Sequence, residues 1–136
     1  MLSGQTPAQV WNTRRSEKQR RLASIPVQGK VLPTGDLVAM LEKLIAPGDR
    51  VVLEGNNQKQ ADFLSRSLAE VNPQKVHDLH MIMPSVGRSE HLDIFEKGIA
   101  RKLDFSFSGT QSLRISQLLE DGLLEIGAIH TYIELY

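Results

Sequence analysis

Residues 50–57 read Arg-Val-Val-Leu-Glu-Gly-Asn-Asn, a short apolar run that ends in a glycine and two asparagines. An apolar run bounded by turn-forming residues is typical of a buried β-strand that leads into a loop. Helical spacing begins soon after it, because apolar residues share one helix face at Ala61, Leu64, Leu68 and Val71. The order strand, loop, helix predicts a βαβ unit and therefore a parallel sheet.

The same alternation extends in both directions from this stretch. Upstream, we expect a helix capped by Thr34, with one apolar face formed by Leu37, Leu41, Leu44 and Ile45. Downstream, we expect strands at 76–83 and 103–107, followed by helices capped by Ser89 and Ser112. The tail, 123–136, is apolar and β-prone. The predicted fold class is α/β, with an open, mainly parallel sheet and flanking helices.

The N-terminal region is basic. Thr6 and Pro7 predict a helix start, and residues 14–21 then carry five basic side chains against one glutamate. No Lys or Arg follows Arg114, so the end of the chain is acidic. We divide the chain into a basic helical arm, 1–32, and an α/β region, 33–136. The arm is either a solvated helix face or a surface that docks phosphates or an acidic partner.

Composition excludes several classes of protein. Lys and Arg together number 16, as do Asp and Glu, so the zero net charge excludes a global basic field for nucleic acid. The absence of cysteine excludes disulfides, thiolate metal sites and a cysteine nucleophile, and it is compatible with the cytoplasm, where we expect the protein. No apolar run approaches the roughly 20 residues of a membrane-spanning helix.

Candidate binding residues follow the predicted strands, where ligands bind in open parallel sheets. Each segment that follows the carboxyl end of a predicted strand contains glycine and short polar side chains. Glycine allows the backbone to approach a ligand closely, and the polar groups can form hydrogen bonds with it. Glu54 ends the first strand, but no positioned substrate gives it a role. The candidates are Gly55, Asn56, Asn57, Gln58 and Lys59 after the first strand, Ser85 after the second and Gly109 after the third.

The histidines do not predict a metal site. On a strand, His77 and His80 face opposite sides, so that only Asp78 and His80 share a face, and no third ligand has suitable spacing. We expect His91 on an exposed helix face. His130 is a structural histidine or lines a site, and the first is the simpler interpretation.

Three stretches of the chain, 47–64, 77–81 and 121–132, closely resemble the α subunit of bacterial malonate decarboxylase. The resemblance runs from about Trp11 to Tyr136. Looser relatives are the citrate lyase α subunit and the family I coenzyme A transferases. The resemblance implies an incomplete coenzyme A transferase-like fold, since that subunit is much longer and the apolar end of this chain is typical of a fragment.

The resemblance also implies an activity, the exchange of malonate for acetate on the thioester of an acyl carrier protein. The implied partners are the carrier protein, the decarboxylase subunits, malonate and acetate. The implied prosthetic group, phosphoribosyl-dephospho-coenzyme A, is borne by the carrier. The glutamate nucleophile of coenzyme A transferases belongs to a later part of the family's chain, so no catalytic residue is assigned here. The alternative function is a non-catalytic module that docks the other subunits.

Overall fold

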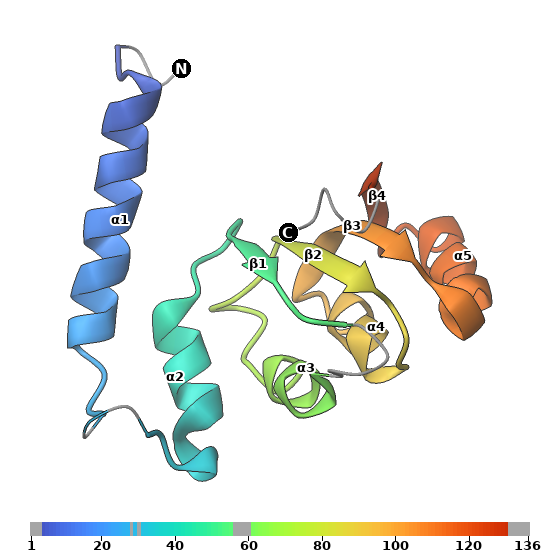
Figure 1. Ribbon diagram of the computed structural model, residues 1–136, viewed down its shortest axis with the longest axis horizontal. Coiled ribbons are helices and arrows are strands. Elements are labelled where there is room, and N and C mark those ends of the chain that lie inside the picture. Colours follow the sequence, from blue (N-terminus) through green and yellow to red (C-terminus); the bar gives the residue numbers. More distant parts are fainter. Residues whose placement is uncertain (1–3, 28, 30, 56–60, 131–136) are drawn as a thin grey trace.

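The computed structural model describes residues 4–27, 29, 31–55 and 61–130. These residues alternate helices with parallel strands, which confirms the predicted α/β class (Figure 1). The elements are α1 (Pro7–Ala23), η1 (Thr34–Asp36), α2 (Leu37–Leu44), β1 (Arg50–Val52), α3 (Asp62–Leu68), β2 (Leu79–Ser85), α4 (Glu90–Glu96), β3 (Ala100–Phe107), η2 (Gly109–Gln111), α5 (Ser112–Glu120) and β4 (Glu125–Ile129).

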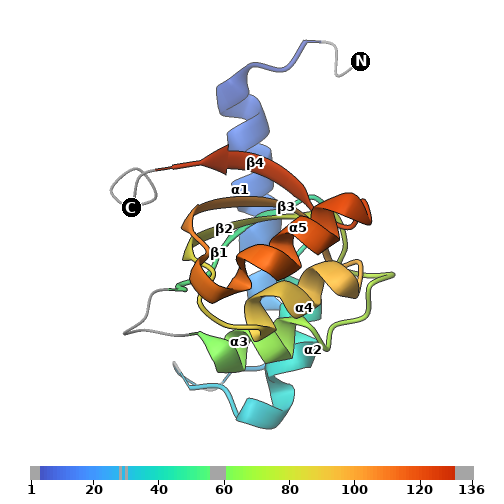
Figure 2. The same cartoon turned by 90° about the vertical axis from the view of Figure 1, so that its right-hand side faces the viewer.

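The four strands lie in the order of the chain, β1-β2-β3-β4, and every pair is parallel. Each connection is therefore a crossover to the next strand in one direction. Right-handed crossovers that always advance in one direction place their helices on one face. Figure 2 shows α3, α4 and α5 together on that face of the sheet. The described part of the chain leaves the opposite face without a helical layer.

The core lies between the sheet and these helices. Alternate residues of β2 point into it, and Leu79, Met81 and Met83 are fully buried. Helix α4 packs against them with a mostly apolar face that includes Leu92 and Phe95. The other alternate residues of β2 and β3 point to the face without helices, where His80, Ile82 and Asp104 are only half-buried. This difference explains why the sheet is strongly apolar on one side only.

Helix α1 stands beside the sheet (Figure 1) and has no buried residue among its 17. Its start is the one predicted, since Thr6 and Gln9 form a capping box and Pro7 occupies the first turn. Lys18 joins it to the rest of the chain, donating to the carbonyl of Leu44 at 3.0 Å and pairing with Asp49.

Three predicted boundaries were wrong. The second strand begins at Leu79 rather than at residue 76, because Asn72 turns the chain by accepting the backbone N–H groups of Lys75 and Val76. The first strand ends at Val52, although Leu53 N still donates to Ile82 O at 3.0 Å. The third strand begins at residue 100 and is longer than predicted.

Of the predicted caps, Ser89 occupies the N-cap position of α4 without a capping hydrogen bond, whereas the predictions of Thr34 and Ser112 were wrong. Thr34 begins a 3-10 turn that precedes α2. Ser89 accepts no backbone N–H as a cap, and its hydroxyl donates to Glu90 instead. Ser112 is the first residue of α5, and its hydroxyl donates to the carbonyl of Gly109 at 2.8 Å. Short serine and threonine hydroxyls have several local partners, and the sequence pattern does not select among them.

Candidate functional site

The carboxyl ends of β1, β2 and β3 meet at one edge of the sheet. The strands are parallel, and the backbone continues to pair beyond them, since Val86 N donates to Phe107 O at 2.8 Å. The chain leaving β1 reaches the end of β2, where Gly55 contacts Ser85. The predicted juxtaposition of the strand exits is thus confirmed for Gly55, Ser85 and the segment that leads to Gly109. Asn56, Asn57, Gln58 and Lys59 lie outside the described residues.

Gly55 is a position that no other residue can occupy without a shift of the backbone. A Cβ atom placed on Gly55 would lie 1.9 Å from the carbonyl oxygen of Ser85 and 3.4 Å from Cε1 of His91. Real carbon–oxygen contacts are more than 1 Å longer. The close approach of the chain after β1 to the end of β2 therefore depends on the missing side chain of Gly55. The glycine was expected to make room for a ligand, and here it makes room for the backbone of Ser85.

Gly109 also has a conformational role. Its φ of 51° lies in the left-handed region, and the hydroxyls of Ser108 and Ser112 lie 2.7 Å apart across the turn that it forms. A Cβ atom on Gly109 would lie 3.0 Å from the ring of Phe107. This turn begins α5 and places exposed hydroxyl and backbone groups at the same edge as Ser85.

His91 was wrongly predicted to be exposed. It is fully buried, and neither ring nitrogen has a hydrogen-bond partner. Burial lowers the pKa of His91 below 6.5, and the negative charge of Glu90 opposes that shift without cancelling it. The apolar spacing of α4 contains the missed signal, because position 91 shares the inward face with Ile94 and Phe95. His91 lies directly beneath the contact between Gly55 and Ser85.

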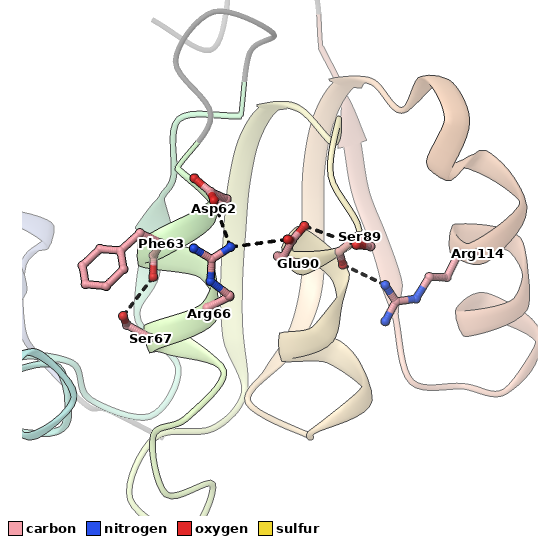
Figure 3. A network of polar contacts seen from close by, with 7 residues as sticks. All are labelled: Asp62, Phe63, Arg66, Ser67, Ser89, Glu90 and Arg114. Atoms are coloured by element: carbon pink, nitrogen blue, oxygen red, sulfur yellow. Dashed lines mark hydrogen bonds and ion pairs between the residues drawn. The ribbon is translucent and has the colours of Figure 1, made fainter.

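An ion network joins the helices that begin at this edge (Figure 3). Arg66 of α3 donates to Asp62 at 2.9 Å and reaches Glu90 of α4 at 3.4 Å. The hydrogen bond from Arg66 lowers the pKa of Asp62. Arg114 of α5 donates to the carbonyl of Ser89 at 2.7 Å, which ties the third helix to the second. The network fixes the spacing between the N-terminal ends of α3, α4 and α5, which follow the carboxyl ends of the strands.

A second polar cluster lies on the sheet face without helices. His80 Nε2 is 2.8 Å from Asp104 Oδ1, and His130 Nε2 is 3.6 Å from Asp104 Oδ2. Burial favours a raised pKa for Asp104, but the contacts with His80, Ala128 N–H and His130 outweigh it and the net pKa is lowered. No group of three metal-ligating side chains is found among the described residues. The shared-face prediction for Asp78 was wrong, because Asp78 precedes β2 and has a φ of 54°.

A bulge in β4 explains the position of Asp104. Leu103 pairs with Ile126, but Phe105 pairs with Ile129, so β4 contains one extra residue. The displaced N–H of Ala128 donates to Asp104 Oδ1 at 2.9 Å. A Cβ atom on Gly127 would lie 2.0 Å from the same oxygen. The pairing of β3 with β4 therefore explains why Asp104 lies in this cluster.

The described part of the chain contains no helix with the length and apolarity that crossing a bilayer requires.

Comparison with known proteins places this geometry in a family. The family model described as malonate decarboxylase, alpha subunit, transporter matches residues 10–136. An acetyl-S-ACP:malonate ACP transferase of Malonomonas rubra is 45% identical over 130 residues, which cover 93% of this chain and 24% of the relative. This chain therefore spans about a quarter of the length of that relative.

Two solved structures have the same fold over this chain. The malonate decarboxylase α subunit of Acinetobacter baumannii is 74% identical with a TM-score of 0.87, covering 93% of this chain and 24% of its own. A chain of a Pseudomonas malonate decarboxylase hetero-tetramer in complex with malonate is 77% identical with a TM-score of 0.88, covering 97% and 24%. The chain belongs to the family of malonate decarboxylase α subunits.

Proposed function

We propose that this chain forms part of an α subunit that exchanges malonate for acetate on an acyl carrier protein. Acetyl carrier and malonate would give malonyl carrier and acetate, so the acetyl C–S bond breaks and a malonyl C–S bond forms on the same carrier thiol. The observation that carries the proposal is the similarity, along 93% of the chain, to a protein named for this transfer. We also propose that the subunit and the carrier protein both reside in the cytoplasm.

The edge that contains Gly55, Ser85 and Gly109 is the part of the chain that suits such a substrate. Gly55 and Ser85 are buried against each other there, and the turn at Gly109 is exposed at the same edge. The exposed Arg88 and the hydroxyl of Thr110 follow β2 and β3 and match the phosphates of phosphoribosyl-dephospho-coenzyme A on the carrier. These residues would bind and orient the acyl carrier, and none is assigned as the nucleophile.

The test uses the complete α subunit with its carrier protein. Labelled acetate on the carrier should be released when malonate is added. Asn56→Ala and Asn57→Ala should each lower the rate, whereas Gln117→Ala, on an exposed position of α5, should leave it unchanged. A subunit that does not exchange the label contradicts the proposed activity. Unchanged rates in both asparagine variants would remove the first loop from the site.

The exposure of α1 favours a second function, the docking of other subunits of the complex. None of its 17 residues is buried, and its basic side chains suit an acidic surface on the carrier protein or on a decarboxylase subunit. A pull-down of those subunits should weaken sharply as salt is raised, and deletion of residues 1–25 should remove this sensitivity. Equal capture with and without these residues would contradict the role of the arm.

A further inference from the structure

The imidazole of His91 is buried in the core of the described chain without a hydrogen bond. Its ring is fully buried, and neither nitrogen has a partner. Leaving both polar atoms of a side chain unpaired in a core costs free energy, and native structures rarely keep such a group without a further role. The next inward positions of α4 hold Ile94 and Phe95, so an apolar residue would fit the pattern at position 91. Packing alone therefore does not explain a histidine here.

The polar edge of the His91 ring faces the chain that leaves β1. Its Cε1 atom lies 3.4 Å from the position that a Cβ atom on Gly55 would take. Cε1 is bonded to both ring nitrogens, so the edge that carries the nitrogens is directed at Gly55. The same Cβ position lies 1.9 Å from the carbonyl oxygen of Ser85. The donor and the acceptor of the imidazole therefore lie beside the backbone at the carboxyl ends of β1 and β2.

The carboxylates near His91 are engaged with another partner. Asp62 and Glu90 are the two whose negative charges act on the ring, and both accept from Arg66, at 2.9 and 3.4 Å (Figure 3). Their charges oppose the effect of burial on the pKa of His91 without cancelling it, so this pKa stays below 6.5. The ring is therefore neutral at neutral pH and carries one N–H donor and one acceptor nitrogen.

We propose that His91 is a positioning residue for acyl transfer, and that its ring N–H donates to the carbonyl oxygen of Ser85 when the acyl carrier occupies this edge of the sheet. The ring is then satisfied only in the loaded state, so the free energy of pairing favours that state. Both residues are buried, and a hydrogen bond is stronger there than in water. The bond would hold the backbone beside Gly55 in one arrangement, which is what an oriented thioester requires. This inference rests on the proposed function, because it names the acyl carrier as the ligand.

The magnetic resonance signal of His91 in the complete α subunit tests the bond. With histidine labelled by ¹³C at Cε1, the signal of His91 is identified by its loss in His91→Leu. It should shift when acetyl carrier is added to saturation, and it should stay in place with a carrier protein that lacks the prosthetic group. An unchanged signal with saturating acetyl carrier would overturn the proposal. Equal shifts with both forms of the carrier would also overturn it, because the change would then follow docking alone.

Variants at position 91 separate positioning from packing. His91→Leu removes a buried polar group at similar volume, so the melting temperature of the subunit should stay the same or rise. The kcat of acyl exchange should fall about 10-fold, as expected for the loss of one hydrogen bond, while KM for malonate stays within about twofold. His91→Gln keeps a donor and an acceptor and should recover part of kcat.

Ser65→Ala is the matched control for these variants. Ser65 is fully buried on α3, and its hydroxyl also lacks a partner, so its loss should leave kcat unchanged. A His91→Leu subunit with the kcat of the wild type, or with a loss no larger than its unfolded fraction, would overturn the proposal. A wild-type subunit in which acetyl carrier shifts the His91 signal but no label is exchanged would contradict the proposed function alone.

Discussion

The side chain of Asp104 on β3 takes the place of a backbone acceptor for Ala128 on β4, at a donor–acceptor distance of 2.9 Å. The contact lies where the extra residue of β4 interrupts the ladder, and Gly127 leaves the space for it. A short polar side chain thus satisfies the one N–H that the bulge displaces.

Asp104→Ala should lower the free energy of unfolding by about 1–3 kcal/mol, because a buried N–H loses its acceptor. Asp104→Asn keeps an acceptor oxygen and should lose less. Urea unfolding at neutral pH measures both, with Asp121→Ala at an exposed position as the control. Equal losses in Asp104→Ala and Asp121→Ala would contradict the role of the contact.

The lowered pKa of Asp104 adds a pH dependence. The unfolded carboxyl has a pKa near 3.8, and the folded one lies below it. The stabilisation is therefore fully present above pH 3.8 and is lost as the pH falls through the folded value. The difference in stability between the wild type and Asp104→Asn should shrink as the pH falls below about 4. A difference that stays constant across that range would contradict the charge contribution.

Gly55→Ala should destabilise the chain by about 1–3 kcal/mol or more, because its Cβ atom would meet the Ser85 carbonyl and the backbone must move. Gly35→Ala is the matched control, since nothing lies within 4 Å of a Cβ atom there. Thermal unfolding of both variants measures the difference. Similar melting temperatures would show that the two strand exits are not in contact.

His91 should make the stability fall in mildly acidic solution. The folded pKa lies below the unfolded value of 6.5, so the folded state binds fewer protons between the two. Stability is fully present above pH 6.5 and is lost as the pH falls toward the folded pKa. His91→Leu should flatten the dependence between pH 5 and 7, roughly the range in which histidine titrates. Gln117→Leu, at an exposed position without a titrating group, should leave it unchanged.

Arg114 should contribute more to stability than Arg66. Arg114 is 24% exposed and bonds to Ser89 O and Asp93, both at 2.7 Å, whereas Arg66 is 49% exposed and pairs with carboxylates on the surface. We expect Arg114→Ala to cost about 1–2 kcal/mol and Arg66→Ala less than about 1 kcal/mol. Arg114→Lys should recover only part of the loss, because lysine lacks the planar fork. Chemical unfolding at two salt concentrations checks this order.

The alternation of strands and helices could be predicted from the sequence because each element carries its own periodicity. The placement of Gly55 and Ser85 at the same edge of the sheet could also be predicted, because parallel strands have their carboxyl ends at one edge. The burial of His91 was missed although its spacing from Ile94 and Phe95 indicates it, because a histidine in a seven-residue helix was read as polar and assigned to the exposed face. The start of β2 was missed because Asn72 bonds to the residues that follow it and holds them in a turn.

The role of Asp104 was missed for a related reason. A single aspartate at a polar position of an alternating strand has no distinctive local pattern, and the extra residue in β4 becomes visible only when two strands separated by a helix are aligned. The resemblance to a family supplied what periodicity lacks, namely the chemistry of the substrate. The binding role of Asn56, Asn57, Gln58 and Lys59 stays a prediction, since these residues lie outside the described ones.

Neighbours in this sheet are also neighbours in the chain. Each new strand therefore finds its partner already made when it leaves the ribosome, and no segment has to wait for a distant one before β4 is added. The nascent polypeptide can therefore build this region of the sheet step by step.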